Sequence, residues 1–428
     1  MLKRIETDDV ELGMFIHRLE GNWFRHPFWK ARFLLEDETL LQRLRHSAVP
    51  GVIIDTARSA APAGARPSGS TRGAPAESPI LRRGARRAAA GRGASPDAAE
   101  REAELRSLAP RTMAREFGLA NRVAERSRRA INRTFLEARL GKAVAPSAVE
   151  PVVDDVFASI QRNAHAFNGL MRCKRDTEFV YRHALSVCAL MISLGRAMKL
   201  EPREIRMAGM AGLLLDVGVG HLPQQGELSA DFRDIDPELF RVHVKLGHDL
   251  LYTGGMPEAV TTACLQHHER LDGSGYPLGL AGEVIGRYGR MAAICDTYDW
   301  LVDDSGGHPA LDPAAAIEHL ARPGSGFDPE LVMRFTEAVG IHPIGAVVEL
   351  ESGRLAMVVA QDDSDPTRPR VRTFWSRNEQ RALPPSDIAL AQCFGEDRIV
   401  GRADLASMMP GDFAPLRERL FAGSCAGG

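Results

Sequence analysis

The stretch His267-His268-Glu269-Arg270-Leu271-Asp272-Gly273-Ser274-Gly275-Tyr276-Pro277 places two adjacent imidazoles at the end of an apolar segment and follows them with a glycine-rich turn. Imidazole and carboxylate groups are the ligands with which proteins hold zinc, manganese or iron. A His-His pair alone is weak support for a metal site, because either ring could be an ordinary core histidine. The hypothesis gains weight from other histidines and acids in the same part of the chain.

Length and composition indicate an ordinary multidomain protein. The chain has 428 residues, of which 44% are hydrophobic and 26% charged, with a formal net charge of -2. This length predicts two or three domains, and the charge gives no general attraction to nucleic acid. No apolar run reaches the ~18 residues of a membrane span, and the first residues do not resemble a signal peptide. We therefore expect a cytoplasmic protein without a membrane span.

The cysteines favour free thiols in a reducing compartment over a disulfide framework. They are scattered and show no CxxC spacing: Cys173, Cys188, Cys264, Cys295, Cys393 and Cys425.

Residues 1–56 predict a small N-terminal α/β module. Apolar runs at Val10–Ile16 and Val52–Ile54 are typical of strands, and a helix is expected over Glu38–Arg45. Residues 57–98 are rich in Ala, Gly, Pro, Ser and Arg and nearly lack large apolar side chains. Such a segment cannot offset the entropy cost of ordering, so it predicts a disordered linker.

The rest of the chain predicts a mainly α protein. A helical connector is expected over 99–144, an all-helical domain over 145–342, and a C-terminal β unit with a tail over 343–428. The expected helices run from Glu100 to about Leu140, from the end of a turn at Gly141–Pro146 to about Leu170, over 177–198 with Thr177 as N-cap, and over Pro202–Leu215. The expected antiparallel strands are Val347–Leu350, Leu355–Val359 and Val371–Trp375.

Four more positions put metal-binding side chains into apolar helical surroundings. His183 falls on the apolar face of its helix, Asp216 lies among leucines and a valine, His243 joins a leucine stripe, and Asp296 interrupts an apolar helix. Each has an ordinary alternative, either a hydrogen-bonded core histidine or an acid that reaches solvent. Together with the His-His pair, so many histidines and acids at apolar positions of one helical domain favour a metal centre.

The order of these residues resembles the HD-GYP family, a branch of the HD metal-dependent phosphohydrolases. The resemblance covers about residues 145–342 and rests on the HHERLDGSGYP block and on Cys295-Asp296-Thr297-Tyr298-Asp299. The N-terminal module resembles a domain of unassigned role that often precedes HD-GYP domains in bacteria, on the strength of Leu12-Gly13-Met14, Trp23, His26-Pro27-Phe28 and Ile54-Asp55-Thr56. Members of the family are hydrolases in bacterial signalling, and cleave the second messenger cyclic di-GMP to pGpG or GMP.

The resemblance implies two divalent-metal sites in an HD-type helical domain. Asp216 would bridge two ions, with His183 and Asp296 on one and the remaining imidazoles on the other: His243, His267 and His268. The ions would activate a shared water for attack on the phosphodiester. The implied catalytic residues are Asp216, His243, His267 and His268. The metal stays open among Fe, Mn, Zn and Ni.

The resemblance also implies a substrate pocket shaped by the glycine-rich turn. Cyclic di-GMP would contact Gly273, Gly275, Tyr276 and Pro277. The surface of this turn would also suit a protein partner. Asp299 matches the family pattern, and we expect it to support its helix rather than to bind metal.

The chain departs from the family pattern at two positions. The histidine of the His-Asp pair is Leu215, and the lysine three residues after the aspartate is Val219. Leucine cannot bind a metal, and valine cannot donate a hydrogen bond to a phosphate. The first site would keep His183, Asp216 and Asp296, with His221 as a less favoured substitute. Phe179 stands where three-metal members have an extra carboxylate.

Three hypotheses follow. The first is a working cyclic di-GMP phosphodiesterase, impaired by the loss of the histidine and lysine. The second is a catalytically inactive HD-GYP domain that acts as a cyclic di-GMP sensor or a protein-interaction module. The third is a nucleotide-independent scaffold, which predicts no bound metal.

Overall fold

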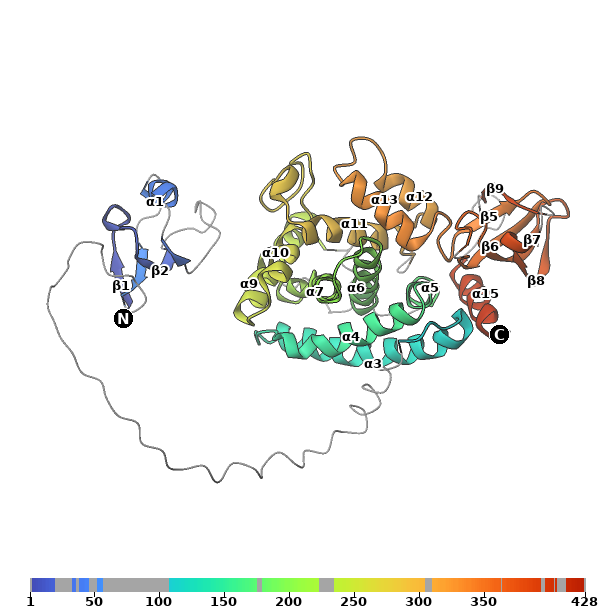
Figure 1. Cartoon of the computed structure of the whole chain (residues 1–428), viewed down its shortest axis with the longest axis horizontal. Coiled ribbons are helices and arrows are strands. Elements are labelled where there is room, and N and C mark those ends of the chain that lie inside the picture. The colour runs from blue at the N-terminus through green and yellow to red at the C-terminus, as the bar shows by residue number, and fades with distance from the viewer. Residues whose placement is uncertain are drawn as a thin grey trace, which may run out of the picture. The chain divides into compact units, whose positions relative to one another are not determined.

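The structure is a computed structural model that describes residues 2–19, 33–35, 38–45, 52–56, 108–174, 179–222, 235–304, 310–362, 364–393, 397–403, 405 and 413–426. The chain divides into two units, Met1–Gly91 and Arg92–Gly428, which are drawn in Figure 1. The linker expected over 57–98 lies outside the described residues.

The N-terminal unit is a four-stranded antiparallel sheet with one helix. The strand order is β1-β4-β2-β3, formed by β1 (Leu2–Ile5), β2 (Phe15–Leu19), β3 (Phe33–Leu34) and β4 (Val52–Asp55). Helix α1 (Glu38–Arg45) has the predicted bounds. The expectation of a strand from Val10 was wrong, because Gly13 adopts a φ of 87° in a turn and β2 begins only at Phe15.

The second unit is mainly helical. Its longer helices are α3 (Met113–Arg139), α4 (Pro146–Arg162), α5 (Ala166–Cys173), α6 (Phe179–Ala197), α7 (Pro202–Leu214), α9 (His243–Thr253), α10 (Glu258–Gln266), α11 (Arg287–Val302), α12 (Pro313–Leu320) and α13 (Pro329–Val339). Figure 1 shows α3 and α4 along one side of this bundle and α6 within it. Every residue of α6 from His183 to Gly195 is buried. A polar side chain on α6 therefore faces protein and needs partners there.

Two of the predicted helices end or begin elsewhere. The helix expected over Glu100–Leu140 is described from Met113 onward, and residues 108–112 before it are not helical. Residues 100–107 of this prediction lie outside the described residues. The helix expected to continue to Leu170 breaks at Asn163, whose side-chain oxygen accepts hydrogen bonds from the backbone N–H groups of His165 and Ala166. This side chain offers the backbone an alternative to helix and so separates α4 from α5. Thr177 lies outside the described residues.

A five-stranded antiparallel sheet follows the helices. Its strand order is β8-β7-β6-β5-β9, formed by β5 (Val347–Leu350), β6 (Arg354–Ala360), β7 (Arg370–Ser376), β8 (Arg381–Ala389) and β9 (Ile399–Arg402). The first three were predicted, whereas β8 and β9 were not. Strand β8 contains Pro384 and Pro385 and lies at an edge of the sheet, where a missing N–H is tolerated.

The sheet is joined to the helices by α15 (Ala414–Ala426), which the sequence also did not predict. Phe421 of α15 makes an edge contact with Phe117 of α3, with ring centroids 5.4 Å apart. Arg417 donates to both carboxylate oxygens of Asp304, just after α11, at 2.7 and 2.9 Å. The C-terminal helix is thus fixed to the end of the helix that carries Asp296. Among the described helices, none combines the length and apolarity that crossing a bilayer requires.

Candidate metal centre

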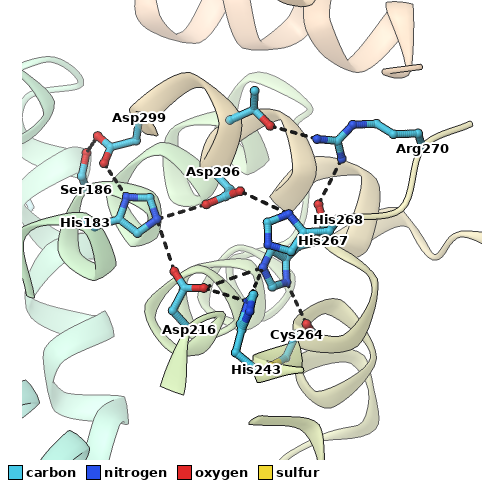
Figure 2. A network of polar contacts seen from close by, with 11 residues as sticks. His183, Ser186, Asp216, His243, Cys264, His267, His268, Arg270, Asp296 and Asp299 are labelled. Carbon is cyan, nitrogen blue, oxygen red and sulfur yellow. Dashed lines mark hydrogen bonds and ion pairs between the residues drawn. The ribbon is translucent and has the colours of Figure 1, made fainter. Parts of the chain in front are cut away.

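Six side chains that are far apart in the sequence meet inside the helical bundle (Figure 2). They come from the second turn of α6, the link that follows α7, the start of α9, the residues directly after α10 and the middle of α11: His183, Asp216, His243, His267, His268 and Asp296. These are the residues that the sequence analysis selected. They form two groups, each with its ligand atoms within 4.8 Å of one another: His243, His267 and His268, and His183, Asp216 and Asp296.

A close backbone approach brings Asp216 beside His243. Asp216 follows α7 and is the N-cap of a 3-10 helix (Val217–His221). This 3-10 helix packs directly on α9. A Cβ at Gly218 would lie 2.1 Å from the carbonyl oxygen of His243 and 2.4 Å from the backbone nitrogen of Gly247. Only glycine fits at position 218. Its absence of a side chain lets the carboxylate of Asp216 reach the imidazole of His243 at 3.1 Å.

Hydrogen bonds to backbone carbonyls set the tautomers of two histidines. His243 Nδ1 lies 2.5 Å from the Phe240 carbonyl oxygen, and His267 Nδ1 lies 2.7 Å from that of Cys264. A ring nitrogen that faces a carbonyl oxygen must carry the proton, so in each neutral ring Nε2 holds a lone pair. These two Nε2 atoms are 3.3 Å apart, and Asp216 Oδ1 lies 3.1 and 3.8 Å from them. Three potential metal-binding atoms from separate segments therefore converge on one point, as the coordination of a divalent cation requires.

His268 completes this group. Its Nε2 is buried and has no hydrogen-bond partner among the described residues. Burial lowers the pKa of His268 well below the usual range, and the neighbouring His267 and His243 lower it further. Burial likewise lowers the pKa of His267. Both rings are therefore neutral near pH 7 and offer lone pairs, which is the protonation state that metal ligation needs.

The second group surrounds His183. The Nδ1–H of this ring donates to Asp299 Oδ2 at 2.7 Å, and Asp299 also accepts a hydrogen bond from the Ser186 hydroxyl. The other ring nitrogen, Nε2, lies 3.0 Å from Asp296 Oδ1 and 3.3 Å from Asp216 Oδ2. A carboxylate behind a histidine in this way orients a metal-binding ring and makes its free nitrogen more basic.

Negative charge dominates the His183 group, as it does in a cation site. Burial alone would lower the pKa of His183, but its bonds to Asp216, Asp296 and Asp299 outweigh burial and hold the pKa well above the usual value. Burial would raise the pKa of Asp216, but the bonds from His183 and His243 hold it well below the usual value. In the protein alone, a protonated His183 thus faces three carboxylates. A divalent ion would supply the missing positive charge.

Comparison with known proteins identifies the chain. A family described as HD domain matches residues 168–331, and a domain of unknown function, DUF3391, matches residues 2–149. Over 405 residues the chain is 37% identical to cyclic di-GMP phosphodiesterase PA4108 of Pseudomonas aeruginosa, covering 94% of this chain and 92% of that protein. This chain belongs to the HD-GYP family.

Other proteins match smaller shares of the chain. Cyclic di-GMP phosphodiesterase response regulator RpfG of Xanthomonas campestris is 34% identical over 142 residues, which are 31% of this chain and 36% of that protein. Among solved structures, Bd1817 of Bdellovibrio bacteriovorus, named an HDG"Y"P protein, superposes with a TM-score of 0.45 at 14% identity, covering 79% of this chain and 99% of that one.

Leu215 and Phe179 are apolar residues at positions where the HD-GYP resemblance implies a metal-binding side chain in other members of the family. Leu215 is buried in the main hydrophobic core, and its carbonyl oxygen accepts a hydrogen bond from Cys264 Sγ. Phe179 stacks on the ring of His183, with centroids 5.3 Å apart and planes at 15°. Within the described part of the chain, His221 belongs to neither group of metal-binding side chains. The His183 group thus offers three ligands and an apolar wall.

The glycine-rich turn is held against the histidines by a residue that the sequence analysis did not select. The buried carboxylate of Glu269 accepts hydrogen bonds from the backbone N–H groups of Leu278 at 2.8 Å and Leu280 at 2.9 Å. A Cβ at Gly275 would lie 2.4 Å from the Cα of Glu269, so the turn passes directly over the His-His-Glu segment. The ring of Tyr276 stacks on His268, with centroids 4.6 Å apart.

Asp299 has a different role from the one expected. Its carboxylate contacts His183 and Ser186 on α6 rather than supporting its own helix. In the sequence, the one sign of this pairing is that Asp296 and Asp299 stand three residues apart in the same helical segment.

Asp299→Ala should weaken the binding of Mn²⁺ by the His183 group about 10–100-fold, because His183 would lose the group that orients its ring. Titration calorimetry of the full chain with Mn²⁺ measures the change. Asp249→Ala, on the exposed side of α9, is the control and should bind Mn²⁺ as the unaltered chain does. Equal affinity in Asp299→Ala and the unaltered chain would show that Asp299 does not position a ligand.

Proposed function

We propose that this HD-GYP protein is a metal-dependent phosphodiesterase that hydrolyses cyclic di-GMP to pGpG and GMP. One observation carries the proposal: buried imidazole nitrogens and a carboxylate oxygen from separate segments converge closely enough to bind a divalent cation together. A relative with the named activity matches nearly the whole chain at 37% identity and supports the substrate.

The ligand sets follow from the two groups. His183 and Asp296 would hold one divalent ion, and the imidazoles of His243, His267 and His268 would hold a second. Asp216 has one oxygen toward each group and would serve both ions. When bound, such a pair of ions activates a water molecule for attack and takes up the charge that develops on the phosphoryl oxygens. Imidazole and carboxylate donors together suit Fe, Mn, Zn or Ni.

The residues of the chain prepare this chemistry before substrate arrives. Asp216 stays ionised because His183 and His243 hold its pKa low. Two carbonyl oxygens fix the protons of His243 and His267 on Nδ1, which leaves Nε2 facing the centre. Because these orientations are set by backbone atoms, little reorganisation is needed when the site is filled.

Aromatic rings limit the access of water to the same space. Phe240 packs on His243, with ring centroids 4.3 Å apart, and lies 6.4 Å from Trp300. Trp300 in turn makes edge contacts with Phe179 and His183. The Gly273–Pro277 turn forms the remaining side, where Tyr276 offers its ring and hydroxyl to a nucleotide.

A second candidate function is a cyclic di-GMP sensor that binds without hydrolysis. Two substitutions favour it. Leu215 removes one imidazole from the His183 group, and Val219 removes the cation that the family places three residues after the bridging aspartate. Loss of a ligand should reduce metal affinity by at least the ~10–100-fold seen for supporting residues. The sensor would keep the imidazole group and the tyrosine-containing turn.

Hydrolysis distinguishes these functions. The full chain, incubated with cyclic di-GMP and Mn²⁺ or anaerobic Fe²⁺, should form pGpG and GMP, measured by chromatography. The double substitution His267→Ala with His268→Ala should form neither, because the second ion loses two of its imidazoles. Binding of cyclic di-GMP without product would establish the sensor instead. Absence of both metal and nucleotide binding would overturn the proposal in favour of a scaffold.

Leu215→His should restore an imidazole to the His183 group. We expect metal occupancy and the hydrolysis rate to rise about 10-fold or more, since the missing ligand limits this group. Elemental analysis and the chromatographic assay measure the two effects. Leu214→His, which alters the adjacent buried residue, is the control and should raise neither. A folded Leu215→His protein with unchanged metal content would show that residue 215 does not face the ions.

A further inference from the structure

Arg241 lies at the mouth of the metal centre, in the turn between α8 (Pro237–Phe240) and α9. Its guanidinium carbon is 5.0 Å from the centroid of the Tyr276 ring. The same ring stacks on His268 of the imidazole group. A cationic side chain is thus one aromatic ring away from the metal-binding histidines.

The guanidinium of Arg241 is available to a ligand. Its side chain is 54% exposed, and its ion pair with Glu238, at 3.5 Å, is with a carboxylate that is itself 79% exposed. Exposed pairs of this kind are weak and exchange readily with other partners. A phosphate competes well for such a group, because the planar guanidinium matches two phosphate oxygens at once.

Two other arginines near the centre are already engaged. Arg270 packs over Phe327 and donates to the carbonyl oxygens of His267 and Glu269 and to the hydroxyl of Thr297. Figure 2 shows the Arg270 guanidinium with dashed lines to its hydrogen-bond partners. Arg182 is paired with the buried Asp303. Position 219, where the family supplies a lysine, is a valine.

The turn that carries Arg241 also positions a metal-binding residue. The carbonyl oxygen of Phe240, the preceding residue, accepts the hydrogen bond from His243 Nδ1. A displacement of this turn would therefore disturb His243 and Arg241 together. The backbone of the turn thus places the Arg241 side chain within reach of a phosphate-containing ligand that also contacts the imidazole group.

We propose that Arg241 is a substrate-binding residue that contacts a phosphodiester group of the cyclic dinucleotide, with Tyr276 beside it as a stacking surface. This inference rests on the proposed function and adds to it the cation that the chain lacks at Val219. Arg241 acts in binding and takes no part in activating water. Its removal should therefore raise KM far more than it lowers kcat.

The test compares Arg241→Ala, Arg241→Lys and the unaltered full chain, each loaded with Mn²⁺. We expect Arg241→Ala to weaken cyclic di-GMP binding about 10-fold or more, as the loss of a charge-assisted hydrogen bond does. Arg241→Lys should recover part of the affinity, since it keeps the charge but not the paired donors. The dependence of binding on salt should become shallower in Arg241→Ala, because one phosphate contact is lost.

Arg334→Ala is the matched control. Arg334 is also a half-exposed arginine paired with a glutamate three residues away on a helix, but it lies on α13. It should bind cyclic di-GMP as the unaltered chain does. Metal content, measured by elemental analysis, should be the same in all variants.

The outcomes separate this inference from the proposed function. If the unaltered chain binds cyclic di-GMP and Arg241→Ala binds it equally well, the role of Arg241 is wrong and the proposed function stands. If Arg241→Ala loses metal as well as nucleotide, the residue is structural and the inference is overturned. If the unaltered chain neither binds nor hydrolyses cyclic di-GMP, both proposals fail.

Discussion

The carboxylate of Asp216 is the constraint on which the rest of the centre depends. One of its oxygens faces His183 and the other faces His243 and His267, so a single side chain connects the two groups of ligands. A buried carboxylate is costly unless cations or donors surround it. Helices α6, α7, α9, α10 and α11 are arranged so that each delivers a partner to this point. Gly218 makes the arrangement feasible by allowing the backbone of the 3-10 helix to touch α9.

The sequence predicted the part of the site that consists of chemically unusual residues. His183, Asp216, His243 and Asp296 could be found because each is a polar exception within an apolar helical pattern, and the structure brings them together with the His-His pair. The helical core and the strands Val347–Leu350 and Val371–Trp375 were predictable for the same reason, since their apolar periodicity is strong. The edge strand β8 was not, because its prolines and exposed residues erase the alternation on which a strand prediction depends.

The sequence could not reveal residues whose function depends on a contact that only the folded chain makes. Asp299 and Glu269 are acids within a block of acids, and only the fold shows that one orients His183 while the other holds the turn at Leu278 and Leu280. Arg241 is one of many arginines in the sequence, and only the fold shows that the turn between α8 and α9 places it over Tyr276. The structural setting of two apolar residues near the site was also visible only in the fold. Leu215 is buried in the hydrophobic core and Phe179 stacks on His183, so both apolar side chains fit the helical domain.

The most direct test of this account is X-ray diffraction from crystals of the full chain grown with Mn²⁺, with anomalous scattering used to locate the ion. The account predicts an anomalous peak among His243, His267, His268 and Asp216, and a weaker peak, because a ligand is missing, among His183, Asp216 and Asp296. Ordered side chains in both groups with no anomalous peak at either would contradict it.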